Sequence, residues 1–249
     1  MKTKIFTLLL AVAAGIGTMF ADGTKIGNLY YNLKSSNKTA EVTFEDYYPN
    51  NYKNLTVANI PSKVEYGGET YNVTSIGKQA FIDCHSLTSV NIGENVTEIK
   101  SNAFQNCSSL TSITIPNSVE SIGVIAFGDC TSMQSIIIGT NLTSLGTHTF
   151  SGCGQVRSIT CYASWPPSCG ANCFNGINKA IPVYVPAEAL NYYKAADEWK
   201  EFYNIQAINT ENIEDIHINN PTNSKLLHNG QIYILRGDKT YTLQGQEVK

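Results

Sequence analysis

The sequence contains little charge. Asp, Glu, Lys and Arg make up 15% of its 249 residues, against about a quarter in ordinary globular domains. Surface helices need charged outer faces, so the low charge points to an architecture other than packed amphipathic helices. The formal net charge is −3. Because phosphate binding needs a basic surface, we expect no nucleic acid partner.

Recognisable catalytic motifs are also missing. The sequence has no glycine-rich phosphate loop, no G-x-S-x-G and no paired carboxylates in a familiar frame. It contains only four histidines, and none falls into a known metal-binding spacing. We therefore expect neither an enzyme nor a bound metal or cofactor.

Long apolar runs are absent after the first residues. The run from Ile5 to Ile16 follows a short basic start and precedes the small residue Ala21, which predicts a secretory signal peptide over residues 1–21. The run is shorter than the roughly 20 residues that cross a bilayer, so we expect no transmembrane segment. No cysteine precedes Cys84, which argues against lipid attachment near the cut. The signal peptide predicts an exported protein.

What the sequence does contain is an internal repeat. Four copies of 23 residues follow one another without insertion: Val73–Asn95, Val96–Ser118, Val119–Asn141 and Leu142–Ser164. Such a period indicates a solenoid, in which each copy packs only on its neighbours.

Equivalent positions of the four copies form columns, and seven columns are apolar. Between them lie mostly Ser, Thr, Asn and Gly, so the apolar columns are predicted to point inward. A β-branched segment in each copy, such as Leu87–Ile92, predicts one short strand per coil and a parallel sheet along the solenoid. The inward columns are Val73, Val96, Val119, Leu142; Ile76, Ile99, Ile122, Leu145; Ala80, Ala103, Ala126, Thr149; Phe81, Phe104, Phe127, Phe150; Leu87, Leu110, Met133, Val156; Val90, Ile113, Ile136, Ile159; and Ile92, Ile115, Ile138, Cys161.

The frame I-G-x-x-A-F-x-x-C-x-x-L-x-x-I-x-I at Ile76–Ile92 resembles the BspA-like leucine-rich repeat family. The flanks resemble it too, with a predicted β-hairpin turning at Gly67-Gly68 and a closing unit from Trp165 onward. There, Pro186 is placed to start a short helix over Ala187–Ala196, and Trp199 with Phe202 would cover the apolar end. The resemblance implies a secreted or surface protein of the Bacteroides group that binds proteins or glycans on host or neighbouring cells.

The predicted fold is thus a β-rich leucine-rich-repeat-type solenoid with 23-residue coils, an N-terminal β cap, a short C-terminal helical cap and a small C-terminal β-hairpin tail. The predicted boundaries are 22–72 for the N-terminal cap, 73–164 for the four repeats, 165–208 for the terminal repeat and cap, and 209–249 for a linker and hairpin tail.

The seven cysteines fall in columns that the repeat buries, which predicts free thiols in the core. Equivalent Cβ atoms of stacked coils lie about 4.8 Å apart, whereas a disulfide wants about 3.8 Å. A disulfide among Cys161, Cys169 and Cys173 stays an alternative. His85 follows Cys84, but the other copies carry Ser, Thr or Gly in its column, so a catalytic Cys-His pair is not expected.

The C-terminal tail carries the tripeptide Arg236-Gly237-Asp238, which integrins recognise, at the expected hairpin tip. Gly and Asp are ordinary turn residues, so a simple turn is the favoured interpretation. The tail as a whole resembles short appendages of secreted bacterial proteins. Cell-surface sorting and a structural appendix are both open.

The candidate binding face is the outward side of the predicted sheet. It is made of small polar groups with one isoleucine and one tyrosine: Ser89, Asn91, Ser112, Thr114, Ser135, Ile137, Ser158, Thr160 and Tyr162. One interpretation is a weakly polar platform that binds a protein or glycan; the alternative is a spacer of the cell envelope with no specific ligand. If the platform is not used, the tyrosines near Tyr47, Tyr48 and Tyr52 are the next candidates. The sequence does not predict an oligomeric state.

Overall fold

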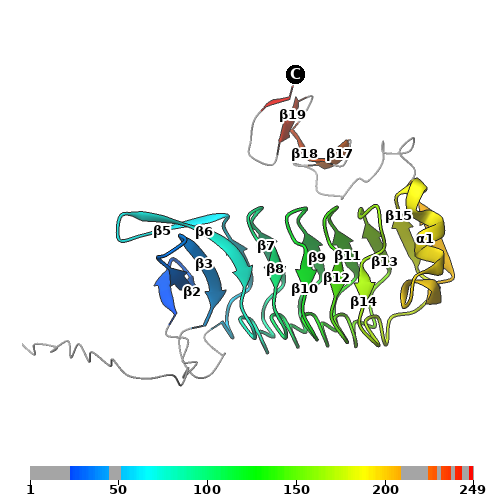
Figure 1. The fold of residues 1–249 in the computed structure, drawn as a ribbon, viewed down its shortest axis with the longest axis horizontal. Helices are drawn as coiled ribbons and strands as arrows, with labels where there is room; N and C mark the ends of the chain where they lie inside the picture. Colours follow the sequence, from blue (N-terminus) through cyan, green and yellow to red (C-terminus); the bar gives the residue numbers. More distant parts are fainter. Residues whose placement is uncertain are drawn as a thin grey trace, which may run out of the picture.

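The protein is a solenoid of short, stacked β-strands, closed at each end by a cap (Figure 1). This computed structural model describes residues 23–44 and 52–208, and the backbone of four further strands between 224 and 248. The predicted solenoid with 23-residue coils is confirmed, because paired residues of successive coils differ by 23 in number, as Ser112, Ser135 and Ser158 do.

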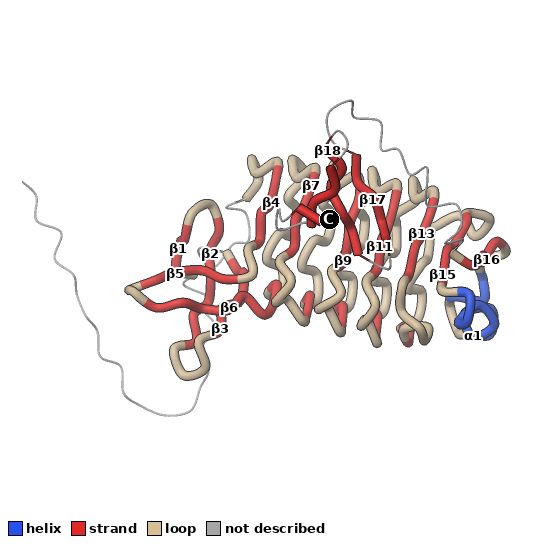
Figure 2. Tube along the Cα trace, turned by 90° about the horizontal axis from the view of Figure 1, so that it is seen from above, coloured by secondary structure: helices blue, strands red, loops and turns tan. Residues whose placement is uncertain are grey.

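Each coil contributes strands to two sides of the solenoid. The longer strands form a row on one side, seen side by side in Figure 2: β4 (Val57–Ile60), β7 (Ser89–Ile92), β9 (Ser112–Ile115), β11 (Ser135–Ile138), β13 (Ser158–Cys161), β15 (Pro182–Val185) and β16 (Asn204–Ala207). Two-residue strands form the second side: β8 (Glu98–Ile99), β10 (Ser121–Ile122), β12 (Ser144–Leu145) and β14 (Ser168–Cys169).

The third side of each coil is a turn that starts with a left-handed residue. Backbone N–H groups here still bond to the next coil, as from Phe81 N to Ala103 O at 2.7 Å. Two columns have positive φ, one with Gln79, Asn102, Ile125, His148 and Asn172 and the other with Asp83, Asn106, Asp129, Gly152 and Gly176. These corners let one coil close within 23 residues.

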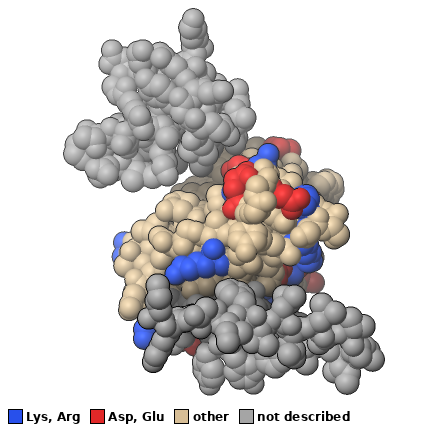
Figure 3. Space-filling model, turned by 90° about the vertical axis from the view of Figure 1, so that its left-hand side faces the viewer, with Lys and Arg blue, Asp and Glu red and all other residues tan. Residues whose placement is uncertain are grey.

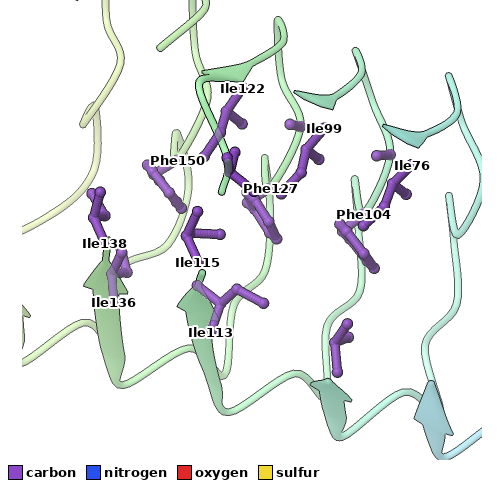
Figure 4. Close-up of a cluster of buried hydrophobic side chains, with 14 of the residues drawn as sticks. Ile76, Ile99, Phe104, Ile113, Ile115, Ile122, Phe127, Ile136, Ile138 and Phe150 are labelled. Carbon is purple, nitrogen blue, oxygen red and sulfur yellow. The ribbon is translucent and has the colours of Figure 1, made fainter. Parts of the chain in front are cut away.

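The core lies between the three sides and is made of the predicted columns (Figure 4). All members are buried except Ile92, which is partly exposed. Phenylalanines of successive coils stack nearly parallel, with ring centroids 5.0 Å apart for Phe81 and Phe104 and 5.1 Å for Phe104 and Phe127. Tyr52 extends this ladder at 4.8 Å from Phe81. The solenoid therefore has one continuous aromatic core.

The N-terminal cap is a set of strands that continue the second side. β1 (Thr24–Ile26), β2 (Leu29–Lys34) and β3 (Thr39–Thr43) pair in order, and β3 pairs in parallel with β6 (Glu69–Ile76). β5 (Lys63–Tyr66) and β6 form the predicted hairpin, turning at Gly67 and Gly68. β6 also pairs in parallel with β8, so the cap and the coils share one sheet.

The C-terminal cap is helical, as predicted. A 3-10 turn, η1 (Ala187–Ala189), leads into α1 (Leu190–Ala195), and a second turn, η2 (Trp199–Glu201), follows. Trp199 and Phe202 are buried and contact the last ring of the ladder, Phe174, at 4.8 and 5.3 Å. The predicted cover over the apolar end is confirmed.

The tail contains a small antiparallel sheet. Its strands pair in order: β17 (Ser224–His228), β18 (Gln231–Arg236), β19 (Lys239–Thr242) and β20 (Glu247–Val248). The predicted hairpin is present, with Arg236 opposite Lys239. Gly237 and Asp238 lie outside the described residues, as do the strand expected at Ile213–Ile218 and the tyrosines Tyr47 and Tyr48.

Candidate functional site

The candidate binding face lies on the row of longer strands, because alternate residues of a strand point to opposite sides. In β9, Ile113 and Ile115 are buried while Ser112 and Thr114 are exposed. The same alternation recurs in the next coils, and parallel pairing places Thr114 beside Ile137 and Ile137 beside Thr160. The sheet thus brings together the predicted residues of β9, β11 and β13 in register.

Their exposure is uneven. Ser112, Thr114 and Asn91 are exposed, whereas the other predicted positions are half-buried: Ser89, Ser135, Ile137, Ser158, Thr160 and Tyr162. Burial raises the pKa of the Tyr162 hydroxyl above its usual value. A ligand on this face would meet small groups packed close to the backbone, with few long side chains to displace.

The face is interrupted between β7 and β9, although the sequence predicts unbroken ladders. β7 pairs with β4, and β9 begins a separate five-stranded sheet. In later coils the residue after the strand donates to the preceding strand, as Gly139 N does to Ile115 O at 3.0 Å. Pro116 occupies this column and has no N–H. The bond that would join it to Ile92 cannot form, which removes one hydrogen bond from the ladder. The two coils still adjoin, because Thr111 N donates to Thr88 O at 3.3 Å, and Pro186 after β15 lacks the same donor although β15 pairs with β13.

The face extends beyond the predicted residues at both ends. Asn59 of β4 pairs with Asn91, and its side chain accepts a hydrogen bond from Asn91 Nδ2 at 2.6 Å. At the other end Tyr184 continues the column of Thr160, and Gln206 follows it. These positions lie outside the four regular copies, so their column could be found only by extending the repeat beyond Val73 and Ser164.

Charged side chains are few along the repeats. At the N-terminal end acidic and basic groups lie close together (Figure 3). One partly buried cluster joins the cap to the coils. Lys100 forms an ion pair with Glu41, which also accepts a hydrogen bond from Ser75 Oγ at 2.8 Å. Burial acts to raise the pKa of Glu41, but the bonds from Lys100 and Ser75 outweigh it and hold the pKa below its usual value.

The sequence interpretation missed this cluster, although a signal for it exists. Lys100 stands in a column that otherwise holds glycine, as at Gly77 and Gly123. In that column a Cβ at Gly123 would lie 2.5 Å from Ser101 N. This close contact explains why the column usually holds glycine. A long charged residue in such a column indicates a specific partner.

All seven cysteines are free thiols. Those of the repeats are buried, and three donate to the carbonyl of a phenylalanine in the preceding coil, as Cys107 Sγ does to Phe81 O at 3.2 Å. Burial raises the pKa of Cys84 to about 12. Cys169 is only partly buried, because it lies in the last two-residue strand. The prediction that all seven are fully buried is wrong for that residue.

The remaining candidates form no site among the described residues. The structure places Tyr52 in the core, where its hydroxyl donates to Thr43 O at 2.7 Å, so the idea of a tyrosine-rich binding cap does not apply to it. His85 is exposed, and its Nδ1 lies 3.0 Å from Asn106 O. Within the described ranges there is no group of His, Cys, Asp and Glu that could hold a metal ion.

The family model for the BspA type leucine-rich repeat region matches residues 51–181 in six copies. The chain belongs to the BspA-type leucine-rich repeat family. This BspA-type protein has no match among curated proteins. In the part of the chain that the structure describes, no helix is long and apolar enough to cross a membrane.

Several solved structures are similar in fold to this BspA-type protein. A leucine-rich repeat protein from Bacteroides capillosus is 24% identical with a TM-score of 0.47, covering 55% of this chain and 96% of its own. A leucine-rich cell surface protein from Faecalibacterium prausnitzii is 23% identical with a TM-score of 0.45, covering 90% of this chain and 60% of its own. The pneumococcal vaccine antigen PcpA is 18% identical with a TM-score of 0.48, covering 68% and 51%.

Proposed function

We propose that this protein is an exported recognition or adhesion protein that binds a protein segment or glycan on a host or neighbouring cell. The carrying observation is the in-register outer face of β9, β11 and β13, where small hydroxyl groups flank Ile137. Each ligand unit could meet the same groups at intervals of about 4.8 Å, the spacing of neighbouring strands. An extended peptide or glycan matches such a periodic surface.

The low charge of this face sets how it would bind. Because neither column carries Lys, Arg, Asp or Glu between β9 and β13, hydrogen bonds and modest apolar contact would supply the affinity. Affinity should then be almost constant between low and physiological salt, unlike that of a charge-driven site.

The test is a binding screen with host matrix proteins and a glycan panel, followed by the double variant Thr114→Lys with Ile137→Lys. The double variant adds bulk and charge to the face without touching the core, so it should abolish binding. The matched control is Thr143→Lys with Val124→Lys, which changes the same kinds of residue, both exposed, beside β10 and β12. Binding that survives the first double variant, or that collapses with salt, would remove the face from the proposal.

A spacer of the cell envelope is the second candidate. The observation that favours it is the continuous aromatic core with hydrogen bonds between coils on every side, which makes a stiff rod. A protein that binds nothing in the screen, yet whose deletion alters the cell envelope, would support the spacer.

A further inference from the structure

The C-terminal cap carries an exposed pair of aromatic rings in contact, tilted relative to each other. Trp165 is 65% exposed and Tyr192 is 49% exposed, and their ring centroids lie 4.3 Å apart at an interplanar angle of 38°. Trp165 follows β13 and Tyr192 lies on α1, which is at the right-hand end of Figure 1. Tryptophan is costly to leave in water, so an exposed ring pair calls for a reason.

The chain around Trp165 is held on both sides by buried groups. The hydroxyl of Tyr193 donates to Ala163 O at 2.9 Å, and the indole of Trp199 donates to Pro167 O at 2.9 Å. Both donors are fully buried. Two prolines follow Trp165 directly and restrict the backbone further.

The same contacts fix the second ring. Tyr193 is anchored in the core, and Tyr192 is its neighbour on α1. Burial of Tyr193 thus fixes the orientation of α1 and, with it, the position of Tyr192 on the exposed side. A ligand that stacks on the pair would lose little free energy to ordering the protein, because the rings are already in place.

The size of the patch decides which ligand fits. Among the described residues six large apolar side chains are exposed, and Trp165 and Tyr192 are the two of them that contact each other. Two partly buried rings expose far less than the roughly 800 Å² that each partner of a stable protein complex buries. A single sugar ring needs no more than one or two aromatic faces.

We propose that the Trp165–Tyr192 pair binds a pyranose ring of an oligosaccharide. Such a ring carries weakly positive C–H groups on a face and hydroxyls around its edge. The C–H face would pack on the electron-rich faces of the aromatic rings. Exposed polar groups flank the pair in the chain, namely Ser164, Asn191 and Glu188 one turn before Tyr192, and these suit the hydroxyls.

The test uses the full chain and three probes, the β-linked trisaccharides of glucose, galactose and N-acetylglucosamine. Trp165 and Trp199 are the only tryptophans, and Trp199 is buried. A saturable change of emission from the exposed indole therefore reports on Trp165. We expect it with at least one probe, and saturation-transfer NMR should detect the same sugar.

The variants distinguish stacking of a sugar on an aromatic ring from binding to any apolar side chain. Trp165→Ala, Trp165→Leu and Tyr192→Ala should each weaken binding by about tenfold or more, while Trp165→Phe keeps a ring and should stay within about threefold. The matched control is Tyr203→Ala, which removes an aromatic ring that is 84% exposed and should change nothing. Thermal unfolding of each variant checks the fold.

The proposal is overturned if none of the three probes binds at tens of millimolar, if binding survives Trp165→Ala, or if Trp165→Leu binds as well as Trp165→Phe. The double variant at Thr114 and Ile137 should leave the sugar signal unchanged. Failure of the outer face and failure of the ring pair are therefore separate results.

Discussion

Ile125 is a β-branched residue at a corner of the coil where the backbone is left-handed. Ile125 adopts φ 56° in a column of left-handed corners, where a β-branched residue is strained. A Cβ at Gly128 would come within 2.5 Å of Ile125 Cγ2. The branched side chain is tolerated because glycine leaves it room.

Replacing Ile125 with a residue that accepts this corner should stabilise the protein. We expect Ile125→Asn to raise the free energy of unfolding by about 1 kcal/mol, because asparagine relieves most of the strain. Chemical denaturation measures this.

The reverse change in the preceding coil is the control. Asn102→Ile should destabilise the protein by at least as much. It introduces the backbone strain and removes the hydrogen bond from Asn102 Nδ2 to Gln105 Oε1 at 2.6 Å. The new side chain would also lie against the Cβ of Gln105, which stands where the next coil has Gly128. A stable Asn102→Ile variant would show that these corners carry no strain.

Thiol reactivity should follow burial residue by residue. Cys169 is the only partly buried thiol among the seven. The hydrogen bond with Cys173 and burial raise the pKa of Cys169, and burial raises the pKa of Cys84 to about 12 and that of Cys161 to about 11, so access from solvent, and not a low pKa, sets the expected order. The thiolate is the species that reacts. We expect a small alkylating reagent at pH 8 to label Cys169 first and the others only in denaturant, as followed by mass spectrometry. Early labelling of Cys107 would contradict the buried column.

The thiol hydrogen bond also changes what Cys107→Ser should cost. From the sequence one expects a buried hydroxyl without a partner, and a loss of about 1 to 3 kcal/mol. In the structure Phe81 O accepts a bond from the thiol and is available to a serine hydroxyl. The expected loss is therefore near the lower end, about 1 kcal/mol, and Cys107→Ala should cost at least as much.

At the scale of elements, the cap and the coils are joined by Glu41 on β3 and Lys100 after β8. The pKa of Glu41 in the folded protein is lowered, so its carboxylate contributes stability above the pKa of an unfolded glutamate, about 4.3. That contribution is lost as the pH falls through the folded pKa.

Glu41→Gln should cost about 1 to 2 kcal/mol at neutral pH, because it leaves Lys100 without its charged partner. The difference from the wild type should shrink below about pH 4. Urea titrations at a series of pH values measure it, and Glu65→Gln, an exposed carboxylate on β5, is the control. If the difference in unfolding free energy between Glu41→Gln and the wild type were the same at every pH, protonation of Glu41 would not contribute to the loss of stability in acid.

Much of the element order could be predicted from the repeat, because a column shows in four copies what one copy leaves ambiguous. The inward columns and the Phe ladder follow from apolar residues at fixed positions. The left-handed corners do not, since Gln79, Asn102, Ile125 and His148 share a backbone conformation and no side-chain chemistry. The ring pair on the C-terminal cap was also out of reach, because Trp165 and Tyr192 lie beyond the regular copies.

For the whole molecule, stability should depend on contacts between neighbouring coils. Phe127 stacks on Phe104 at 5.1 Å and on Phe150 at 5.3 Å. Phe127→Ala would remove both contacts and leave a cavity, at a cost of about 3 to 5 kcal/mol.

Thermal unfolding measures this cost, and Val124→Ala is the control. Val124 lies in the same coil but is 42% exposed, so its truncation should change the stability by no more than about 0.5 kcal/mol. A small effect of Phe127→Ala would mean that the ladder is not a principal source of stability.

The shared register also governs how such a protein can change in length. Because Phe81, Phe104 and Phe127 stand in equivalent surroundings, recombination between copies can remove or duplicate a coil without disturbing its neighbours, provided the exchanged length is 23 residues. Loss of Val96–Ser118 would place Gly139 in the position of Pro116 and restore the missing donor next to Ile92. The same event would delete Lys100 and remove its ion pair with Glu41. The second coil thus carries two local features, and its gain or loss would change both the hydrogen bonding beside Ile92 and the ion pair that links a coil to the cap.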